Sequence, residues 1–261
     1  MIEMLGRFQY NDVIFSGEVF DGVVYPDPVY QQLDDEYPLS SLLILPPSLP
    51  SKIVCVGLNY TDHAKELNME LPKTPILFLK PPSAILAHEG LILYPPKSGQ
   101  VDYEAELGIV IGKKCRRISE ENALDYILGY TCFNDVTARD LQRADGQWTR
   151  AKSFDTFAPA GPFIVTPEEL ARQNLSPGNL SVSCRVIRGQ NEEVRQSSST
   201  KELIFDIPKL ISFISSVMTL EKGDLIATGT PPGVGELLVG DTVEVEIEGI
   251  GVLRNTVSSV E

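Results

Sequence analysis

Histidine and cysteine are scarce in this sequence, and their scarcity limits the chemistry that the chain can perform. Only two of the 261 residues are histidine, which excludes a metal site built from imidazoles alone. The four cysteines are too few for disulfide bonds to stabilise a chain of this length. None of them forms a C-x-x-C pair that would indicate a thiolate metal site. We therefore expect reduced thiols and a cytoplasmic location.

Basic side chains and long apolar runs are also in short supply. The chain has 22 lysines and arginines against 36 acidic residues, which gives a formal net charge of -14. Because nucleic acids and anionic membranes are polyanions that require a basic surface, neither is expected as a partner. No apolar run approaches the ~20 residues that span a bilayer. The first ten residues also lack the basic and then apolar pattern of a signal peptide.

What the sequence does contain is an ordinary globular composition, with 43% hydrophobic and 8% aromatic residues. Residues 1–50 are expected to form a small β lobe and its linker. Short apolar runs flank an Asp21-Gly22 hairpin turn there, and a proline-rich segment ends the region. Residues 51–261 would then form a second, catalytic domain.

Short strands dominate this second region. The expected strands are Ile53–Gly57, Ile76–Leu79, Ala105–Ile111, Leu128–Asn134, Phe163–Val165, Ser181–Ile187, Leu225–Ala227 and Thr242–Ile247. Helices are fewer, and Thr61, Thr166 and Asp206 are the expected N-caps. Because strands and helices do not alternate regularly, a doubly wound nucleotide-binding fold is disfavoured and a mostly β (α+β) fold is predicted.

Two glutamates lie two residues apart in an otherwise apolar strand. Side chains alternate between the faces of a strand, so Glu104 and Glu106 share one face. Two carboxylates ~7 Å apart along a strand need a cation between them, or one must bind a proton. Asp135, at the end of the next predicted strand, would complete an all-oxygen site suited to Mg²⁺ or Mn²⁺ rather than Zn²⁺. The alternative is an exposed acidic face on an acidic protein.

His63 is the one histidine with an obvious partner in the sequence. In a short helix beginning near Thr61, His63 and Glu66 are three residues apart and lie on one face. A histidine held by a carboxylate is typical of a general base that deprotonates water. The alternative is a partly buried histidine at the start of a helix. His88 falls in a predicted turn and is interpreted as structural.

Two cations and one loop complete the candidate site. Arg139 and Lys152 follow the proposed metal acid Asp135 closely and suit recognition of a carboxylate substrate, although surface salt bridges are the alternative. The Gly/Pro-rich segment 227–235 lacks the Gly-Lys-Ser/Thr ending of a phosphate-binding loop and the G-x-G-x-x-G dinucleotide spacing. It is interpreted as a rigid loop that lines a pocket.

Taken together, these segments resemble the fumarylacetoacetate hydrolase family. The stretches that carry the resemblance occur in the family's order: Val56–Tyr60 with His63 and Glu66, Asp102–Leu107, Asn134–Asp140, Lys152–Asp155 and Thr228–Val234. Any one of these stretches is weak evidence, whereas five in register are strong. They cover residues 52 to about 250.

The resemblance implies a β-roll, usually dimeric, in which the three carboxylates described above hold a divalent ion. It also implies that the His63–Glu66 pair activates water, with Lys152 near the metal. The positions at which family members contact substrate are Arg139, Gln142 and Thr230.

The activity that the resemblance implies is less narrowly defined, because one shared site serves several reactions in this family. Hydrolysis of a C–C bond in an acylpyruvate-type substrate is the first expectation. The alternatives are decarboxylation of an oxaloacetate-type acid, and isomerisation or keto–enol tautomerisation of the 2-hydroxyhepta-2,4-dienedioate kind. Outside enzymes, the competing hypothesis is a metal-stabilised protein that binds a small molecule.

Overall fold

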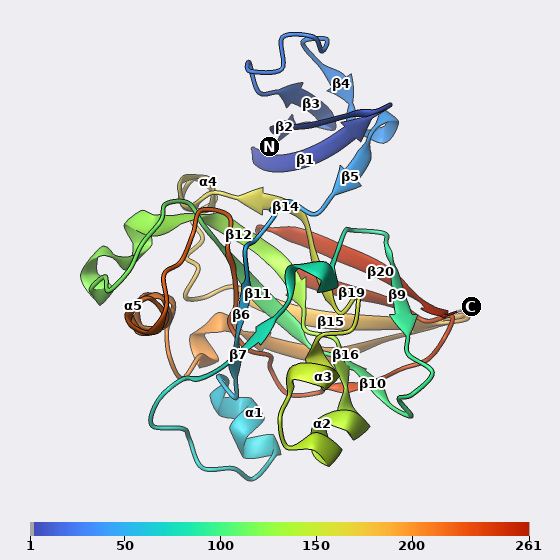
Figure 1. Cartoon of the computed structure of the whole chain (residues 1–261), viewed down its shortest axis with the longest axis vertical. Helices are drawn as coiled ribbons and strands as arrows, with labels where there is room; N and C mark the ends of the chain where they lie inside the picture. Colours follow the sequence, from blue (N-terminus) through green and yellow to red (C-terminus); the bar gives the residue numbers. More distant parts are fainter. Residues whose placement is uncertain (1–2, 261) are drawn as a thin grey trace.

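Strands are the main secondary structure, as the sequence predicts, and one large sheet organises the fold (Figure 1). The computed structural model describes residues 3–260. The strand order of the large sheet is β4-β3-β2-β1-β14-β12-β11-β17-β6-β7, with β5 paired to β1 and β8 paired to β14. Its strands are β1 (Met4–Tyr10), β2 (Val13–Phe20), β3 (Val23–Pro26), β4 (Tyr37–Pro38), β5 (Leu43–Leu45), β6 (Ile53–Gly57), β7 (Ile76–Lys80), β8 (Ile85–Leu86), β11 (Ala105–Ile111), β12 (Ile127–Asn134), β14 (Ala158–Val165) and β17 (Leu225–Ala227).

Two smaller sheets pack with the large one. A five-stranded sheet has the order β16-β15-β19-β20-β9, and a three-stranded sheet has the order β13-β10-β18. Their strands are β9 (Leu91–Tyr94), β10 (Val101–Tyr103), β13 (Thr137–Ala138), β15 (Ser181–Arg188), β16 (Asn191–Ser199), β18 (Gly235–Leu237), β19 (Thr242–Ile247) and β20 (Gly251–Ser259). One apolar core joins the inner faces of β11 and β12 to those of β15 and β19.

The helices are short and lie around the sheets. They are α1 (Thr61–Glu66), α2 (Arg139–Asp145), α3 (Thr149–Lys152), α4 (Pro167–Arg172) and α5 (Ile207–Val217), with 3-10 turns at Leu39–Ser41, Pro82–Ala84, Glu120–Tyr126 and Thr200–Glu202. The predicted caps of α4 and α5 are confirmed, because the side chains of Thr166 and Asp206 accept backbone N–H bonds. The predicted cap of α1 is wrong. Thr61 is already the first helical residue, and its hydroxyl donates to Glu202 instead.

The N-terminal strands have an apolar cluster of their own, which includes Phe8, Phe15 and Tyr37. The predicted turn is present, since Phe20 pairs with Val23 across Asp21-Gly22. Hydrogen bonding between β1 and β14 nevertheless makes this lobe an extension of the large sheet (Figure 1). The division of the chain into residues 1–50 and 51–261 stays a prediction, and residues 1, 2 and 261 lie outside the described part.

The central strand β11 brings the acidic residues to one end of the large sheet. It is buried along its whole length between β12 and β17. Its antiparallel register with β12 pairs Ala105 with Asn134, so the start of β11 meets the end of β12. Helices α1, α2 and α3 lie close to this end in Figure 1. Among the described residues, no helix is long and apolar enough to cross a membrane.

Candidate metal centre and active site

Three buried carboxylates meet where β11 begins and β12 ends. One oxygen from each of Glu104, Glu106 and Asp135 lies within 4.8 Å of the others. Glu104 is located in the one-residue break between β10 and β11, and its carbonyl accepts a 2.9 Å hydrogen bond from the backbone N–H of Asp135. The three side chains are almost fully buried, so an exposed acidic face is excluded for them. The predicted grouping is therefore present.

Two of these carboxylates are held by the cations that the sequence singled out. Lys152 Nζ donates to Glu104 Oε2 at 2.9 Å and to Asp135 Oδ2 at 2.6 Å. Arg139 contacts Glu104 through Nη2 and Asp102 through Nε, the latter at 2.8 Å. Burial alone would raise the pKa of Glu104, but Lys152 and Arg139 outweigh burial and lower that pKa to about 2. Surface salt bridging is thus not the role of either cation.

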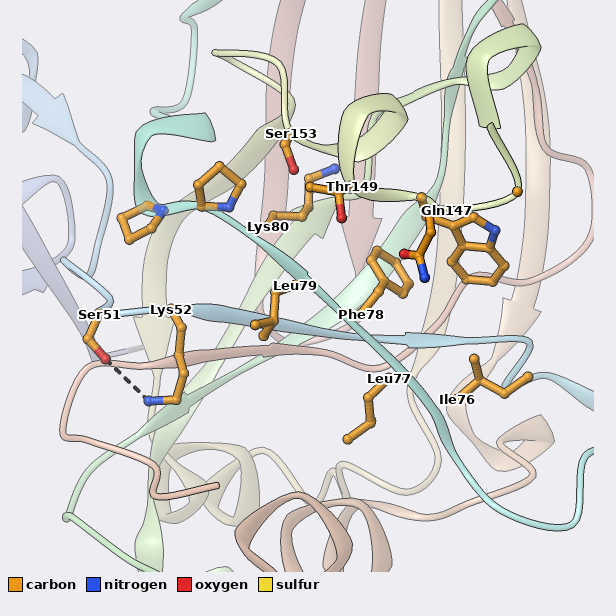
Figure 2. A pocket seen from close by; sticks show the side chains of 14 residues that line it. Ser51, Lys52, Ile76, Leu77, Phe78, Leu79, Lys80, Gln147, Thr149 and Ser153 are labelled. Carbon is orange, nitrogen blue, oxygen red and sulfur yellow. Dashed lines mark hydrogen bonds between the residues drawn. The ribbon is translucent and has the colours of Figure 1, made fainter. Parts of the chain in front are cut away.

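A third cation at the cluster, Lys80, was not identified from the sequence. It is the last residue of β7, it is 1% exposed, and its Nζ contacts Asp135 Oδ1 and donates to the Val136 carbonyl at 2.9 Å. Burial lowers the pKa of Lys80, and the nearby Asp135 opposes that effect. The sequence signal that could have identified Lys80 is its spacing of two residues from Phe78, because this spacing puts both side chains on one face of β7. Figure 2 shows both on the side of the strand that faces Thr149 and Ser153.

Glu106 differs from its two neighbours because no cation contacts it among residues 3–260. Its carboxylate accepts a 2.7 Å hydrogen bond from the Gly229 backbone N–H. Burial raises the pKa of Glu106 well above its ordinary value, and the charges of Asp135 and Glu104 raise it further. That N–H is aimed at Glu106 by a backbone turn that favours glycine, since Gly229 has a φ of +100°.

The charges of the cluster fit a divalent ion. When Glu106 is ionised, the connected groups comprise four acids and three cations: Asp102, Glu104, Glu106 and Asp135 against Lys80, Arg139 and Lys152. The unmatched charge belongs to Glu106, which must bind either a proton or a further cation. Three carboxylate oxygens in close proximity are the donors that hard divalent ions prefer. The residues present could therefore hold a divalent metal ion.

His63 and Glu66 are brought together on α1 in the predicted arrangement. His63 Nδ1 lies 2.8 Å from Glu66 Oε2, and the other oxygen of Glu66 accepts a 3.0 Å hydrogen bond from the Gly233 backbone N–H. Glu66 is thus anchored to the Gly/Pro-rich loop, and it fixes the ring of His63. Because Nδ1 is engaged, Nε2 is the ring nitrogen left for another partner. The role of His63 as a general base stays a prediction.

The predicted site residues surround one cavity of about 380 Å³. It is lined by every predicted site residue except Glu66, which contacts His63: His63, Glu104, Glu106, Asp135, Arg139, Gln142, Lys152 and Thr230. Gln142 Oε1 accepts a 2.6 Å hydrogen bond from Arg139 Nη1. The Thr230 hydroxyl is fixed between Gln196 and the Ala105 carbonyl. Direct contact of Arg139, Gln142 and Thr230 with substrate stays a prediction.

The cavity has an apolar wall that sequence reasoning did not identify. The rings of Phe78 and Trp148 pack edge to face with centroids 5.2 Å apart, and Lys152 Nζ lies 5.0 Å from the centre of the Phe78 ring. Gly57 permits this wall, because a Cβ at that position would lie 2.8 Å from the Trp148 ring. These aromatic residues come from separate elements, so their spacing in the sequence carries no sign of their contact.

A larger neighbouring cavity of about 800 Å³ shares Phe78 and Trp148 with the first and extends along β7 to Lys52 (Figure 2). None of the three candidate metal ligands lines it. His88 also lies outside the site, and its Nδ1 accepts a 3.1 Å hydrogen bond from the Arg254 backbone N–H. The interpretation of His88 as structural agrees with that contact.

Known proteins share the sequence and the fold of this chain. The family model described as fumarylacetoacetate (FAA) hydrolase C-terminal matches residues 52–258. The mitochondrial oxaloacetate tautomerase Fahd2a of Rattus norvegicus is 44% identical over 229 residues, which cover 84% of this chain and 71% of the relative.

Solved structures extend the likeness to almost the whole chain. 5-Carboxymethyl-2-hydroxymuconate delta-isomerase from Mycobacterium smegmatis has a TM-score of 0.87 and 42% identity, with 99% of each chain covered. Maleylpyruvate hydrolase from Sphingobium sp. SYK-6, crystallised with a manganese(II) ion and pyruvate, has a TM-score of 0.82 and 29% identity, with 99% of this chain and 100% of that one covered. This chain therefore belongs to the fumarylacetoacetate hydrolase family.

Proposed function

We propose that this protein is a divalent-metal-dependent enzyme that moves a proton at the carbon next to the keto group of an α-keto acid. The reaction would be a keto–enol tautomerisation or isomerisation. The observation that carries the proposal is the His63–Glu66 pair, whose 2.8 Å contact leaves Nε2 free beside the carboxylate cluster in one cavity. The likeness to a tautomerase and to an isomerase supports the same class of reaction.

His63 would act as the base in this reaction. Its Nε2 takes a proton from the carbon adjacent to the keto group, and the carboxylate of Glu66 stabilises the imidazolium that results. The same nitrogen then returns the proton to the enolate oxygen, which completes the tautomerisation, or to a different conjugated carbon, which completes an isomerisation. The ammonium of Lys152 offsets the negative charge that develops on the keto oxygen.

The metal would be held by Glu104, Glu106 and Asp135. When bound, Mg²⁺ or Mn²⁺ supplies a Lewis acid that polarises the keto and carboxylate oxygens of the substrate. Likeness to a structure that contains manganese(II) and pyruvate supports a divalent ion and an α-keto acid together. Ionised Glu106 is required for this role, so metal binding must release the proton that burial favours there.

Hydrolysis of an acylpyruvate, which the sequence analysis placed first, is the second candidate. The same His63 would take a proton from water, which then attacks the distal carbonyl of the substrate. The C–C bond breaks and its electron pair leaves with the pyruvate enolate. The likeness to maleylpyruvate hydrolase supports this candidate. Decarboxylation of oxaloacetate needs no base, so it would not depend on His63.

The proposal is tested by measuring turnover of two substrates, enol oxaloacetate and acetylpyruvate, in the presence of Mg²⁺, of Mn²⁺ and of EDTA. Enol oxaloacetate is followed by ultraviolet absorbance and by malate dehydrogenase, which consumes the keto form. Acetylpyruvate is followed by release of pyruvate. The variants are wild type, His63→Ala and the control His88→Ala, which removes the histidine that lies outside the cavity. Metal without protein gives the background rate.

We expect chelator-sensitive tautomerisation that falls by about 10²- to 10⁴-fold in His63→Ala and is unchanged in His88→Ala. Pyruvate release from acetylpyruvate with the same dependence would establish the hydrolase instead. Oxaloacetate loss to pyruvate that survives His63→Ala would indicate a decarboxylase. If no substrate turns over, Glu106→Ala that lowers the melting temperature in the presence of Mn²⁺ but not in EDTA would indicate a metal-stabilised binding protein.

A further inference from the structure

The cavity is lined by one arginine whose charge is not matched. Besides His63, its basic side chains are Arg139, Arg143 and Lys152. Arg139 is bound to Asp102 and Glu104, and Lys152 is bound to Glu104 and Asp135. Within residues 3–260 no carboxylate pairs with Arg143, and its side chain is exposed at the cavity. Its guanidinium is therefore available to a ligand.

Helix α2 sets the position of this guanidinium relative to the carboxylate cluster. Arg143 follows Arg139 by four residues, so both lie on one face of α2 and Arg143 is one turn, ~6 Å along the axis, beyond Arg139. The helix is fixed at its start. Asp140 accepts hydrogen bonds from the Gly99 backbone N–H at 2.8 Å and from the Ser98 hydroxyl at 2.7 Å.

The nearest acid in the sequence does not neutralise Arg143. Asp145 is bound by both Nε and Nη2 of Arg150, the first contact at 2.7 Å. The other wall of the cavity, formed by Phe78 and Trp148, offers no charge or hydrogen-bond donor of comparable strength. Arg143 is thus the strongest site for an anion in the outer part of the cavity.

An unmatched arginine here has a clear physical use. The chain carries a formal charge of -14, which repels an approaching dianion. A guanidinium binds a carboxylate through two parallel hydrogen bonds, and such charge-assisted bonds are stronger than neutral ones. The carboxylate cluster and its ion would take only the keto-acid end of a substrate, so a second carboxylate has to be met elsewhere.

We propose that Arg143 binds the distal carboxylate of a dicarboxylic α-keto acid and makes the site selective for such acids over uncharged acyl analogues. This inference rests on the proposed function and specifies its substrate class. Arg143 is a specificity-determining residue in this view. It binds the end of the substrate that does not react and takes no part in proton transfer.

The test is a binding measurement with two acids that differ only at the distal end. 2-Oxoglutarate ends in a carboxylate, whereas 2-oxopentanoate has the same chain length and ends in a methyl group. Each is titrated by calorimetry into Mn²⁺-loaded wild type, Arg143→Met, Arg143→Lys and Arg150→Met. The last variant is the matched control, because Arg150 lies outside the cavity and pairs with Asp145.

We expect wild type to bind 2-oxoglutarate about 10- to 100-fold more tightly than 2-oxopentanoate. Arg143→Met should abolish that preference while the affinity for 2-oxopentanoate stays within about twofold of wild type. Arg143→Lys should retain part of the preference, and Arg150→Met should retain all of it.

Equal affinities of wild type for the two acids would overturn the inference, as would a preference that survives Arg143→Met. Either result leaves the proposed function intact, because both keto acids still bind. If neither acid binds the Mn²⁺-loaded protein, the proposal of an α-keto acid substrate fails, and the role of Arg143 fails with it. Failure of the Arg143 inference alone and failure of the proposed function therefore give different calorimetric titrations.

Discussion

The unmatched charge of Glu106 predicts that a metal ligand destabilises the metal-free protein. We expect Glu106→Gln to raise the melting temperature in EDTA at pH 7. Glutamine keeps an oxygen to accept the Gly229 N–H, and its amide can donate to the neighbouring carboxylates. The substitution thus removes a buried charge that no cation contacts among the described residues, while the packing volume is conserved.

The size of the effect follows from the geometry in two ways. Two carboxylate charges within 4.8 Å of each other repel by at least about 3 kcal/mol at an effective dielectric constant of 20. Alternatively, Glu106 stays protonated because burial raises its pKa, and holding that proton at a pH above the ordinary pKa of 4.5 also costs stability. Attraction to Lys152 offsets part of either cost. We expect a gain of about 2–3 kcal/mol, or roughly 4–10 °C for a chain of this size.

The pH dependence of stability tests independently whether Glu106→Gln is stabilising. Because the folded pKa of Glu106 is raised, the folded protein binds a proton that the unfolded chain releases above pH 4.5. Wild-type stability therefore falls, relative to the variant, as pH rises from 4.5 toward the folded pKa. The advantage of Glu106→Gln should vanish near pH 4 and grow by at most about 1.4 kcal/mol per pH unit above it.

Thermal unfolding followed by circular dichroism, at fixed protein concentration in EDTA from pH 4 to pH 8, measures both effects. Glu104→Gln is the control and should lower the melting temperature, because it leaves Lys152 and Arg139 without one of their partners. Mn²⁺ should reverse the order of wild type and Glu106→Gln. A lower melting temperature for Glu106→Gln in EDTA at pH 7, or an advantage that does not change with pH, would refute the reasoning.

Three further predictions concern other parts of the structure. Lys80→Met should lower the melting temperature in EDTA by roughly 6–20 °C, and Mn²⁺ should raise it more than in wild type, because the ion replaces a positive charge at Asp135. Gly229→Ala should lower turnover at least about tenfold, since φ is +100° and the new Cβ would lie 2.8 Å from Asn59 Cβ; steady-state kinetics on folded protein measures this loss. The four buried cysteines should not react with a thiol reagent until denaturant is added, and rapid labelling of the native protein would contradict their burial.

Much of the secondary structure could be predicted from the sequence because its signals are local. Strand β11 was predicted with its observed bounds, since alternation and an apolar run specify a buried strand directly. The caps at Thr166 and Asp206 depend on residues within one helical turn. The expected strand at Phe163–Val165 was too short, because β14 begins at Ala158 and its proline and glycine residues conceal the extension.

In the candidate site, too, local features could be predicted from the sequence and long-range contacts could not. Glu104 with Glu106, and His63 with Glu66, could be grouped from the sequence because period two in a strand and spacing three in a helix place each pair on one face. Neither rule says whether the two groups meet. Their presence in one cavity depends on the register of β11 with β12 and on the packing of α1 against the end of the sheet.

The sequence by itself determined the mostly β character of this protein, the acidic residues available to a metal and the histidine paired with a carboxylate. Only the tertiary structure decided that Lys80 reaches Asp135 from β7 and that, within residues 3–260, Glu106 has no cationic partner and Arg143 has no acidic one. The physical reason is the difference in the sequence range over which these interactions act. Hydrogen-bonding and apolar periodicity act over a few residues, whereas charge balance in a buried site sums over segments that lie far apart in the chain.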